Sequence, residues 1–206
     1  MIAILDYGVG NLFSLVSSLR MIGAEAEITS DPAAIRRADK LILPGVGAFE
    51  DAAEKLRQSG LAELLCEQAA SGKELLGICL GMQLLFERSF EYGEHRGLGL
   101  LHGSVVPMEG KIPQELKIPH IGWNQLHFQK DHRLLKYIRE KDCVYFVHSF
   151  YAEDCGDSLI ATAEYGRELT AMVAKDNVMG CQFHPEKSGD VGLRILKAFC
   201  ESEERV

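Results

Sequence analysis

The most informative segment of the sequence is Glu74-Leu75-Leu76-Gly77-Ile78-Cys79-Leu80-Gly81-Met82-Gln83-Leu84-Leu85-Phe86. Its apolar residues 75–78 predict a buried strand, and the apolar run that follows predicts a helix over residues 80–88. Cys79 stands between them with a glycine two residues away on each side. This is the strand–turn–helix pattern of a nucleophile elbow, with cysteine in place of serine. We therefore expect a reactive thiol at a helix N-terminus, where the helix dipole favours a thiolate.

Strands and helices alternate through the first ninety residues. The patterns predict strands at 2–5, 24–29, 40–43 and 75–78, and helices at 12–22, 49–57, 61–71 and 80–88. Beyond Ser89, strands are expected at 143–147, 159–165, 170–174 and 178–183, before a helix at 190–200. The alternation predicts an α/β, flavodoxin-like fold with a mostly parallel central sheet flanked by helices. The later strands predict antiparallel additions in the C-terminal half.

Composition limits the kinds of protein that the chain can be. The 206 residues, 47% of them hydrophobic, predict a single domain spanning residues 1–206. A net charge of −8 argues against nucleic-acid binding. We expect no membrane span, because no run of about 18 apolar residues occurs. We also expect no signal peptide, because the N-terminus has no basic region and reaches Asp6 after five residues. Six scattered cysteines predict free thiols in a reducing cytoplasm, with no metal site and no cofactor.

Two glycine-rich turns follow predicted strands. Gly8-Val9-Gly10 lacks the third glycine and the lysine of nucleotide-binding loops, so we expect a tight turn with Asn11 as the N-cap of the next helix. Pro44-Gly45-Val46-Gly47 can turn several backbone N–H groups toward one point. Because ligands of open α/β sheets bind at the carboxyl ends of strands, this second loop is either a candidate oxyanion site for Cys79 or simply another turn.

A second candidate group ends the last predicted strand, at His184-Pro185-Glu186. Pro185 stops strand pairing, and residues two apart in an extended segment point the same way, so Glu186 is placed to contact His184. A carboxylate there would fix the ring's tautomer and stabilise its protonated form. Cys79, His184 and Glu186 are therefore the candidate nucleophile, base and orienting carboxylate. A strand-ending histidine beside a solvated glutamate is the simpler alternative for the last two residues alone.

The other histidines give weaker signals. Four lie in polar or loop contexts and are expected at the surface: His95, His102, His127 and His132. His120 and His148 lie in two aromatic stretches, 119–124 and 145–151, that favour either core packing or a partner surface.

These motifs together resemble those of a known family. Pro44-Gly45-Val46-Gly47, Gly77-Ile78-Cys79-Leu80-Gly81-Met82-Gln83 and His184-Pro185-Glu186 resemble the class I (triad) glutamine amidotransferases. Asp6-Tyr7-Gly8-Val9-Gly10-Asn11, Pro119-His120-Ile121-Gly122-Trp123-Asn124 and the continuation of the last motif through Lys187-Ser188 resemble, in particular, the glutaminase subunits of imidazole glycerol phosphate synthase, an enzyme of histidine biosynthesis. The likeness extends over essentially the whole chain.

The resemblance implies hydrolysis of L-glutamine to glutamate and ammonia. Cys79 would attack the carboxamide carbon to give an oxyanion and then a glutamyl thioester, while His184, oriented by Glu186, would protonate ammonia and later activate water. The implied oxyanion donors are Leu80 and the loop of Gly45, Val46 and Gly47. The implied substrate-binding residues are Gln83, Glu91, His148, Ser149 and Phe150, the last of which is often tyrosine in the family.

The same resemblance implies a partner. This would be a cyclase subunit with a (β/α)8-barrel fold, in a 1:1 heterodimer, which receives ammonia through a shielded channel. The partner would make imidazole glycerol phosphate and aminoimidazole carboxamide ribotide from an N'-ribulosyl formimino nucleotide. Residues at partner-facing positions of the family are His120, Trp123, Tyr145 and Lys187.

Two other hypotheses stay open on the sequence. The chain could be a glutaminase of another pathway or a related cysteine hydrolase, which the stretch at 119–124 argues against. It could also be an inactive scaffold or regulatory subunit, which the complete set of Cys79, His184 and Glu186 argues against.

Overall fold

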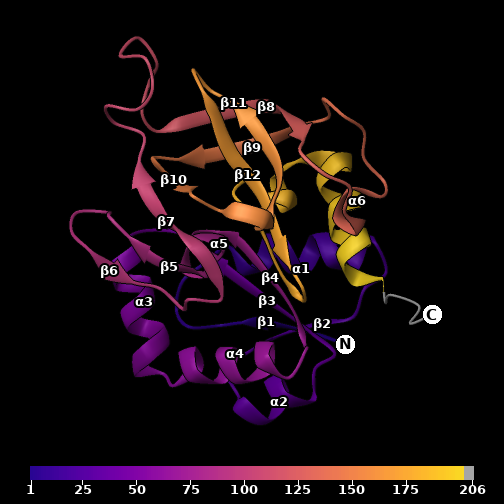
Figure 1. Ribbon diagram of the computed structural model, residues 1–206. Helices are drawn as coiled ribbons and strands as arrows, with labels where there is room; N and C mark the ends of the chain where they lie inside the picture. The colour runs from indigo at the N-terminus through magenta and orange to yellow at the C-terminus, as the bar shows by residue number, and fades with distance from the viewer. Residues whose placement is uncertain (202–206) are drawn as a thin grey trace.

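The computed structural model describes residues 1–201, and a nine-stranded sheet forms its centre (Figure 1). Five strands make up one half of this sheet: β1 (Ile2–Leu5), β2 (Ala26–Thr29), β3 (Lys40–Gly45), β4 (Glu74–Cys79) and β13 (Val178–Cys181). Four strands extend it: β8 (His120–Phe128), β9 (Cys143–His148), β11 (Leu159–Glu164) and β12 (Glu168–Lys175). The strand order is β2-β1-β3-β4-β13-β12-β11-β8-β9.

Strand direction changes at β13. The pairings from β2 to β13 are all parallel, and those from β13 to β9 are all antiparallel. Alternating strands and helices produce the parallel half, because each crossover returns the chain to the same end of the sheet. The predicted α/β fold, a parallel sheet with antiparallel strands added in the C-terminal half, is confirmed, and the sheet as a whole is mixed.

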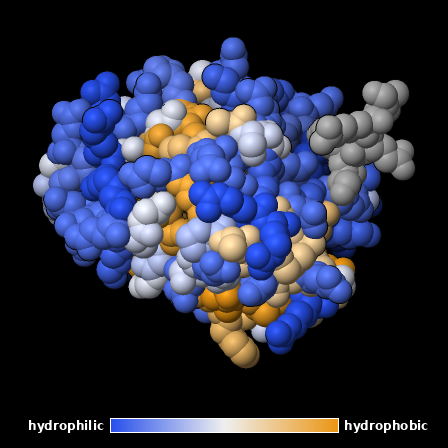
Figure 2. All heavy atoms as spheres, turned by 90° about the horizontal axis from the view of Figure 1, so that it is seen from below, coloured by the Kyte–Doolittle hydropathy of each residue, from blue (hydrophilic) through white to orange (hydrophobic). Residues whose placement is uncertain are grey.

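Helices cover both faces of the parallel half (Figure 1). One face carries α2 (Pro32–Arg37), α3 (Phe49–Gln58), α4 (Leu61–Ala70) and α5 (Leu80–Leu84), and the other carries α1 (Leu12–Met21) and α6 (Gly189–Cys200). In β3, Leu41 and Leu43 belong to the first core and Ile42 to the second. Burial on both faces explains the continuous apolar runs of the inner strands β1, β3, β4 and β13. Seen from below, the surface is mostly hydrophilic, with a smaller hydrophobic area (Figure 2).

A second, four-stranded sheet corrects one prediction. It contains β5 (Phe86–Ser89), β6 (His95–Arg96), β7 (Leu101–Pro107) and β10 (Phe150–Glu153), in the order β10-β7-β5-β6. The prediction of a helix over residues 80–88 is therefore wrong beyond Leu84. The backbone N–H groups of Leu98 and Leu100 bond the carbonyl oxygens of Leu84 and Leu85 at 2.8 and 2.9 Å. Those carbonyls are no longer available to N–H groups of a longer helix.

The remaining differences are small. The strand predicted at 178–183 ends at Cys181. Helix α2 was not predicted, although Asp31 caps it by accepting hydrogen bonds from the N–H groups of Ala33 and Ala34. Asn11 occupies the N-cap position of α1 but makes no side-chain capping bond. Short 3₁₀ helices are η1 (Arg133–Leu135), η2 (Gly156–Ser158) and η3 (Pro185–Lys187). Within residues 1–201, no helix is long and apolar enough to cross a membrane.

Candidate active site

The junction of β4 and α5 holds Cys79 in a strained backbone conformation. Its φ of 55° and ψ of −113° are rarely adopted by a residue with a side chain. A Cβ on Gly77 would lie 2.7 Å from the Gly81 carbonyl oxygen, and a Cβ on Gly81 would lie 1.8 Å from the carbonyl oxygen of Leu43. Only glycine permits these approaches, so the predicted elbow is present with Cys79 at the start of α5.

The neighbouring strand brings His184 to the same end of the sheet as Cys79. The parallel register of β13 with β4 makes both strands finish at one edge. Beyond β13, the 3₁₀ turn η3 places Glu186 beside the ring, with His184 Nδ1 2.8 Å from Glu186 Oε1. The two side chains are 3% and 4% exposed, so water screens their interaction little. The predicted histidine–carboxylate contact is present, made by a turn rather than by an extended segment.

The charges of this group favour a protonated His184. Burial opposes the charge, but hydrogen bonds to Cys79 and Glu186 and the charges of both groups outweigh it and raise the pKa of His184 to about 9. The ring is therefore held as an imidazolium at neutral pH. Glu186 Oε2 is buried and has no hydrogen-bond partner among the described residues, so the carboxylate interacts chiefly with His184 through Oε1.

Gln182, which the sequence analysis did not single out, completes the surroundings of the thiol. Its fully buried side chain donates from Nε2 to Cys79 Sγ at 3.8 Å and accepts from Gln83 Nε2 at 2.9 Å. Gln83 also donates to the Phe150 carbonyl oxygen at 3.0 Å. Hydrogen bonds thus connect the thiol, through Gln182 and Gln83, with the backbone at Phe150, which is 67 residues from Gln83 in sequence. The one signal in the sequence was a polar residue in an otherwise apolar strand.

The loop after β3 lies directly against the elbow. Strands β3 and β4 remain in register up to Gly45 and Cys79. A Cβ on Gly45 would lie 2.8 Å from the backbone nitrogen of Gly81, which explains the glycine. Gly47 has a φ of 95°, in the left-handed region that favours glycine. The elbow and this loop therefore bring together the predicted oxyanion donors Leu80, Gly45, Val46 and Gly47.

A cavity of about 380 Å³ opens beside Cys79 and His184. Its lining includes the five residues predicted to hold the substrate: Gln83, Glu91, His148, Ser149 and Phe150. Glu91 Oε2 accepts a hydrogen bond from the Phe49 N–H at 2.7 Å, and burial raises the pKa of Glu91 despite this bond. A larger cavity of about 530 Å³, between α3, α4 and β6, contains none of the triad residues.

Three of the four residues predicted to face a partner lie together near the surface. Trp123 is 55% exposed, and its ring centroid lies 5.9 Å from that of Tyr145, which is half-buried. Lys187 is exposed, with Nζ 6.0 Å from the Tyr145 ring centroid. These side chains come from β8, β9 and η3, so the predicted surface is formed by adjacent elements.

His120 does not belong to that surface. It is 1% exposed, so its side chain packs inside the chain, apart from the exposed Trp123 and Lys187. Its Nδ1 lies 3.1 Å from His148 Nε2 and its Nε2 lies 2.7 Å from Asn124 Oδ1. Burial lowers the pKa of both histidines, to about 3 for His148, so both rings are neutral at pH 7. Among the histidines expected at the surface, His95 is also largely buried, with its side chain 16% exposed.

A buried cysteine–histidine–carboxylate group at the end of a parallel sheet defines a class of amide-cleaving enzymes, and the comparisons with known proteins agree. The chain belongs to the class I glutamine amidotransferases, because the family described as Glutamine amidotransferase class-I matches residues 3–202. A solved structure described as a glutamine amidotransferase matches with a TM-score of 0.74 at 20% identity, covering 96% of this chain and 98% of its own. PurLQS from Thermotoga maritima matches with a TM-score of 0.76 at 21% identity, covering 96% of each chain. These two similarities establish the fold.

Relatives of higher identity specify the family further. Imidazole glycerol phosphate synthase subunit HisH of Wolinella succinogenes is 50% identical over 98% of this chain and 99% of its own length. The subunit of the same name from Caldanaerobacter subterraneus is 52% identical over 98% of each chain. The chain is thus a member of the HisH family, which confirms the predicted resemblance. Family members are named as subunits, which implies a partner subunit.

Proposed function

We propose that this chain is the glutaminase subunit of imidazole glycerol phosphate synthase, and that it hydrolyses L-glutamine to glutamate and ammonia with Cys79, His184 and Glu186. The observation that carries the proposal is the strained Cys79 beside a buried His184–Glu186 pair, at the opening of a cavity. A thiol attacks an amide only when a neighbouring base and acid manage the protons, and this group supplies both.

The reaction proceeds in two halves. Cys79 Sγ attacks the carboxamide carbon, and the negative charge passes to the carboxamide oxygen. The carbon–nitrogen bond then breaks, and His184 gives its proton to the departing ammonia, which leaves a glutamyl thioester. Water attacks the thioester while His184 takes one of its protons, releasing glutamate and the thiolate. Glu186 stabilises the imidazolium in both halves.

Backbone groups beside the thiol stabilise the oxyanion. The Leu80 N–H at the start of α5 and an N–H of residues 45–47 are the donors that we assign, since both segments flank Cys79. A single such donor contributes about 2.7–4 kcal/mol to lowering the barrier. The amino-acid end of glutamine is held by Gln83, Glu91 and the segment from His148 to Phe150, which line the same cavity.

Ammonia then passes to the partner. We assign the partner as the (β/α)8-barrel cyclase subunit, in a 1:1 complex, which makes imidazole glycerol phosphate and aminoimidazole carboxamide ribotide. Trp123, Tyr145 and Lys187 are the proposed contact residues, supported by the adjacency of their side chains. Residues 1–206 act as one glutamine amidotransferase domain. The six free cysteines support a cytoplasmic location.

The test compares glutamine hydrolysis by the chain alone, and with the cyclase subunit and its nucleotide ligand. We expect a low rate alone and a much higher rate in the complex. Cys79→Ala should lower the rate in the complex by at least about a thousandfold, because the nucleophile is lost. Cys143→Ala is the matched control, since Cys143 is exposed and distant in sequence from the triad.

The alternatives predict different results. A glutaminase of another pathway would not be activated by this cyclase. An inactive scaffold would not be labelled at Cys79 by the glutamine analogue diazo-oxo-norleucine in the assembled complex, whereas the proposal expects one label per chain. Retention of hydrolysis by Cys79→Ala would show that the nucleophile is wrongly assigned.

A further inference from the structure

Tyr7 lies in the turn after β1 and contacts the loop that we assign to oxyanion binding. Its side chain is 6% exposed, and its hydroxyl donates a hydrogen bond to the Pro44 carbonyl oxygen at 2.7 Å. The main-chain pairing of β1 with β3 ends two residues before Pro44, at the pair Ile4 and Ile42. Beyond that pair, the side-chain hydrogen bond of Tyr7 takes the place of main-chain pairing between this segment and β3.

This hydrogen bond fixes the peptide at which the loop begins. The Pro44 carbonyl and the Gly45 N–H belong to one planar peptide group, so holding the oxygen also sets the direction of the N–H. A Cβ on Gly45 would lie 2.8 Å from the Tyr7 hydroxyl oxygen and 2.8 Å from the Gly81 nitrogen. The Tyr7 hydroxyl and the elbow are thus both close to the residue that carries this N–H.

The rest of the turn after β1 supports the same peptide. A Cβ on Gly10 would lie 3.3 Å from Cβ and Cγ of Pro44, so the turn packs closely against the proline ring. Asp6 Oδ1 accepts a hydrogen bond from the Gly8 N–H at 3.1 Å, which stabilises the turn itself. One local segment therefore holds Pro44 through both its carbonyl oxygen and its ring.

The hydroxyl remains a donor throughout the working pH range. Burial, and secondarily the charge of Cys79, raise the pKa of Tyr7 above its ordinary value. The influence of Cys79 also indicates that the hydroxyl and the thiol are electrostatically close, although the hydroxyl's hydrogen bond is to the loop and not to the sulfur.

We infer that Tyr7 is a positioning residue for the glutaminase reaction, whose hydroxyl holds the Pro44–Gly45 peptide so that residues 45–47 present their N–H groups to the oxyanion. The inference rests on the proposed function, since it concerns an intermediate of that reaction. It assigns a role to the turn at residues 6–11, which the triad mechanism leaves without one. The Tyr7 hydroxyl is hydrogen-bonded to Pro44 and not to a triad residue, so it acts through the loop.

The test is Tyr7→Phe, measured in the complex with the cyclase subunit and its ligand. Loss of the hydroxyl frees the peptide and misplaces the oxyanion donors, so we expect kcat to fall between about tenfold and a hundredfold. KM should change less than about twofold, because the proposed substrate-binding residues of the cavity are unchanged and Tyr7 is not among the residues that line it. Tyr137→Phe is the matched control, because it removes one hydroxyl hydrogen bond, to Glu201 Oε1 at 2.6 Å, outside the site.

A second measurement separates the loop from the thiol. Iodoacetamide alkylates Cys79 by direct displacement at carbon and forms no oxyanion, so its rate reports the thiolate alone. We expect Tyr7→Phe to be alkylated at the wild-type rate, within about twofold, while its turnover is reduced. Urea unfolding of the same sample establishes that the protein is folded.

Two outcomes would overturn the inference. An unchanged kcat in folded Tyr7→Phe would show that the hydroxyl does not position the donors. An equal fall in turnover and alkylation would show that Tyr7 acts on the thiol instead of on the loop. Failure of the proposed function would give a different result, because the wild-type chain would then hydrolyse no glutamine in the complex. The role of Tyr7 is tested by comparing kcat of Tyr7→Phe with that of an active wild type.

Discussion

At the scale of single residues, His184 and Glu186 determine how the site responds to pH. Their side chains meet at 2.8 Å with little exposure to water. Although burial opposes the charge, Cys79 and Glu186 raise the pKa of His184 to about 9. The ring is therefore protonated at pH 7 and loses its proton as the pH rises through about 9. Because the departing ammonia takes its proton from this ring, we expect kcat/KM for glutamine to fall over that alkaline range.

Glu186→Gln tests the cause of this raised pKa. The change keeps the shape of the side chain but removes its negative charge, so the imidazolium loses one of its stabilising partners and the pKa of His184 falls. We expect the alkaline decline of kcat/KM to begin at a lower pH than in wild type. The measurement is the pH profile of glutamine hydrolysis in the complex with the cyclase subunit.

The control for this profile is Glu94→Gln. Glu94 pairs with Arg88 at 3.2 Å at the surface, with a side chain 60% exposed, and should leave the profile unchanged. An alkaline decline that stayed at the wild-type pH in Glu186→Gln would mean that the carboxylate does not set the pKa of His184.

At the scale of elements, the elbow depends on how closely α5 and β3 approach. A Cβ on Gly81 would lie 1.8 Å from the Leu43 carbonyl oxygen, which is a backbone atom that side-chain rotation cannot move away. Gly81→Ala must therefore displace the start of α5, and with it Cys79. We expect the free energy of unfolding to fall by about 3 kcal/mol or more, and kcat to fall at least about a hundredfold.

Gly60→Ala provides the comparison for Gly81→Ala. Gly60 precedes α4 with a φ of 72°, but a Cβ there would meet nothing within 4 Å. Its substitution should cost only the backbone strain of a left-handed residue, about 1 kcal/mol. Urea unfolding measures both variants. A cost for Gly81→Ala no greater than that for Gly60→Ala would show that the approach of α5 to β3 does not explain the glycine at position 81.

The elements differ in how far their own residues specify them. The elbow was predictable, because the apolar strand, the flanking glycines and Cys79 are consecutive in sequence. The end of α5 was not, because the N–H groups that take the carbonyls of Leu84 and Leu85 come from residues 98–101. The segment Phe86–Ser89 consequently becomes strand β5 against its apparent helical periodicity. Local patterns are overridden where distant backbone groups compete for the same hydrogen bonds.

The same distinction applies to the site. His184 and Glu186 are neighbours in sequence, so their contact could be anticipated from spacing. Gln182 and Tyr7 look like ordinary residues of a strand and a turn, and they matter because β13 and β1 place them beside Cys79 and Pro44. The burial of His120 depends on its pairing with His148 across β8 and β9, 28 residues apart in sequence. Contacts between residues of different elements could not be predicted from spacing along the sequence.

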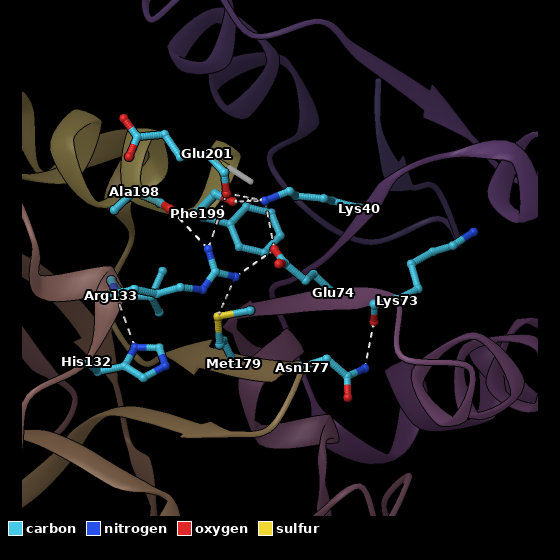
Figure 3. A network of polar contacts seen from close by, with 11 residues as sticks. Lys40, Lys73, Glu74, His132, Arg133, Asn177, Met179, Ala198, Phe199 and Glu201 are labelled. Atoms are coloured by element: carbon cyan, nitrogen blue, oxygen red, sulfur yellow. Dashed lines mark hydrogen bonds and ion pairs between the residues drawn. The ribbon is translucent and has the colours of Figure 1, made fainter. Parts of the chain in front are cut away.

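At the scale of the whole molecule, the two ends of β3 and β4 have different functions, one in the candidate site and one in stability. Their final residues, Gly45 and Cys79, form the site. Their first residues, Lys40 and Glu74, form an ion pair at 2.8 Å that belongs to a larger polar network (Figure 3). Arg133 joins the network by donating to Glu74 Oε2 at 2.6 Å. The proposed chemistry therefore lies at the carboxyl ends of β3 and β4, and this largely buried network lies at their amino ends.

The network also secures the C-terminal helix. Lys40 Nζ donates to the carbonyl oxygens of Phe199 at 2.7 Å and Glu201 at 2.5 Å, and Arg133 Nη1 donates to that of Ala198 at 3.2 Å (Figure 3). These carbonyls are at the end of α6, where the helix has no N–H groups of its own to offer. Two cations placed there also interact favourably with the helix dipole. The network thus joins α6 to the first residues of two central strands.

Lys40→Met should lower stability without altering catalysis. Lys40 has a side chain only 8% exposed, so its loss takes one donor from the carbonyl oxygens of Phe199 and Glu201 and removes one of the two cations on Glu74. Breaking a buried pair in this way costs about 3–5 kcal/mol of the free energy of unfolding.

Lys136→Met is the matched control for Lys40→Met. It also loses a bond to Glu201, at 2.9 Å, but its side chain is 57% exposed, so we expect little change in the free energy of unfolding. Urea unfolding measures the stability of both variants. Glutamine hydrolysis in the complex is measured without urea, and it should give wild-type kcat and KM because Gly45 and Cys79 lie at the opposite ends of the strands. A reduced kcat in folded Lys40→Met would show that the two ends of β3 and β4 are coupled, and an equal loss of stability in Lys136→Met would show that burial does not distinguish the two lysines.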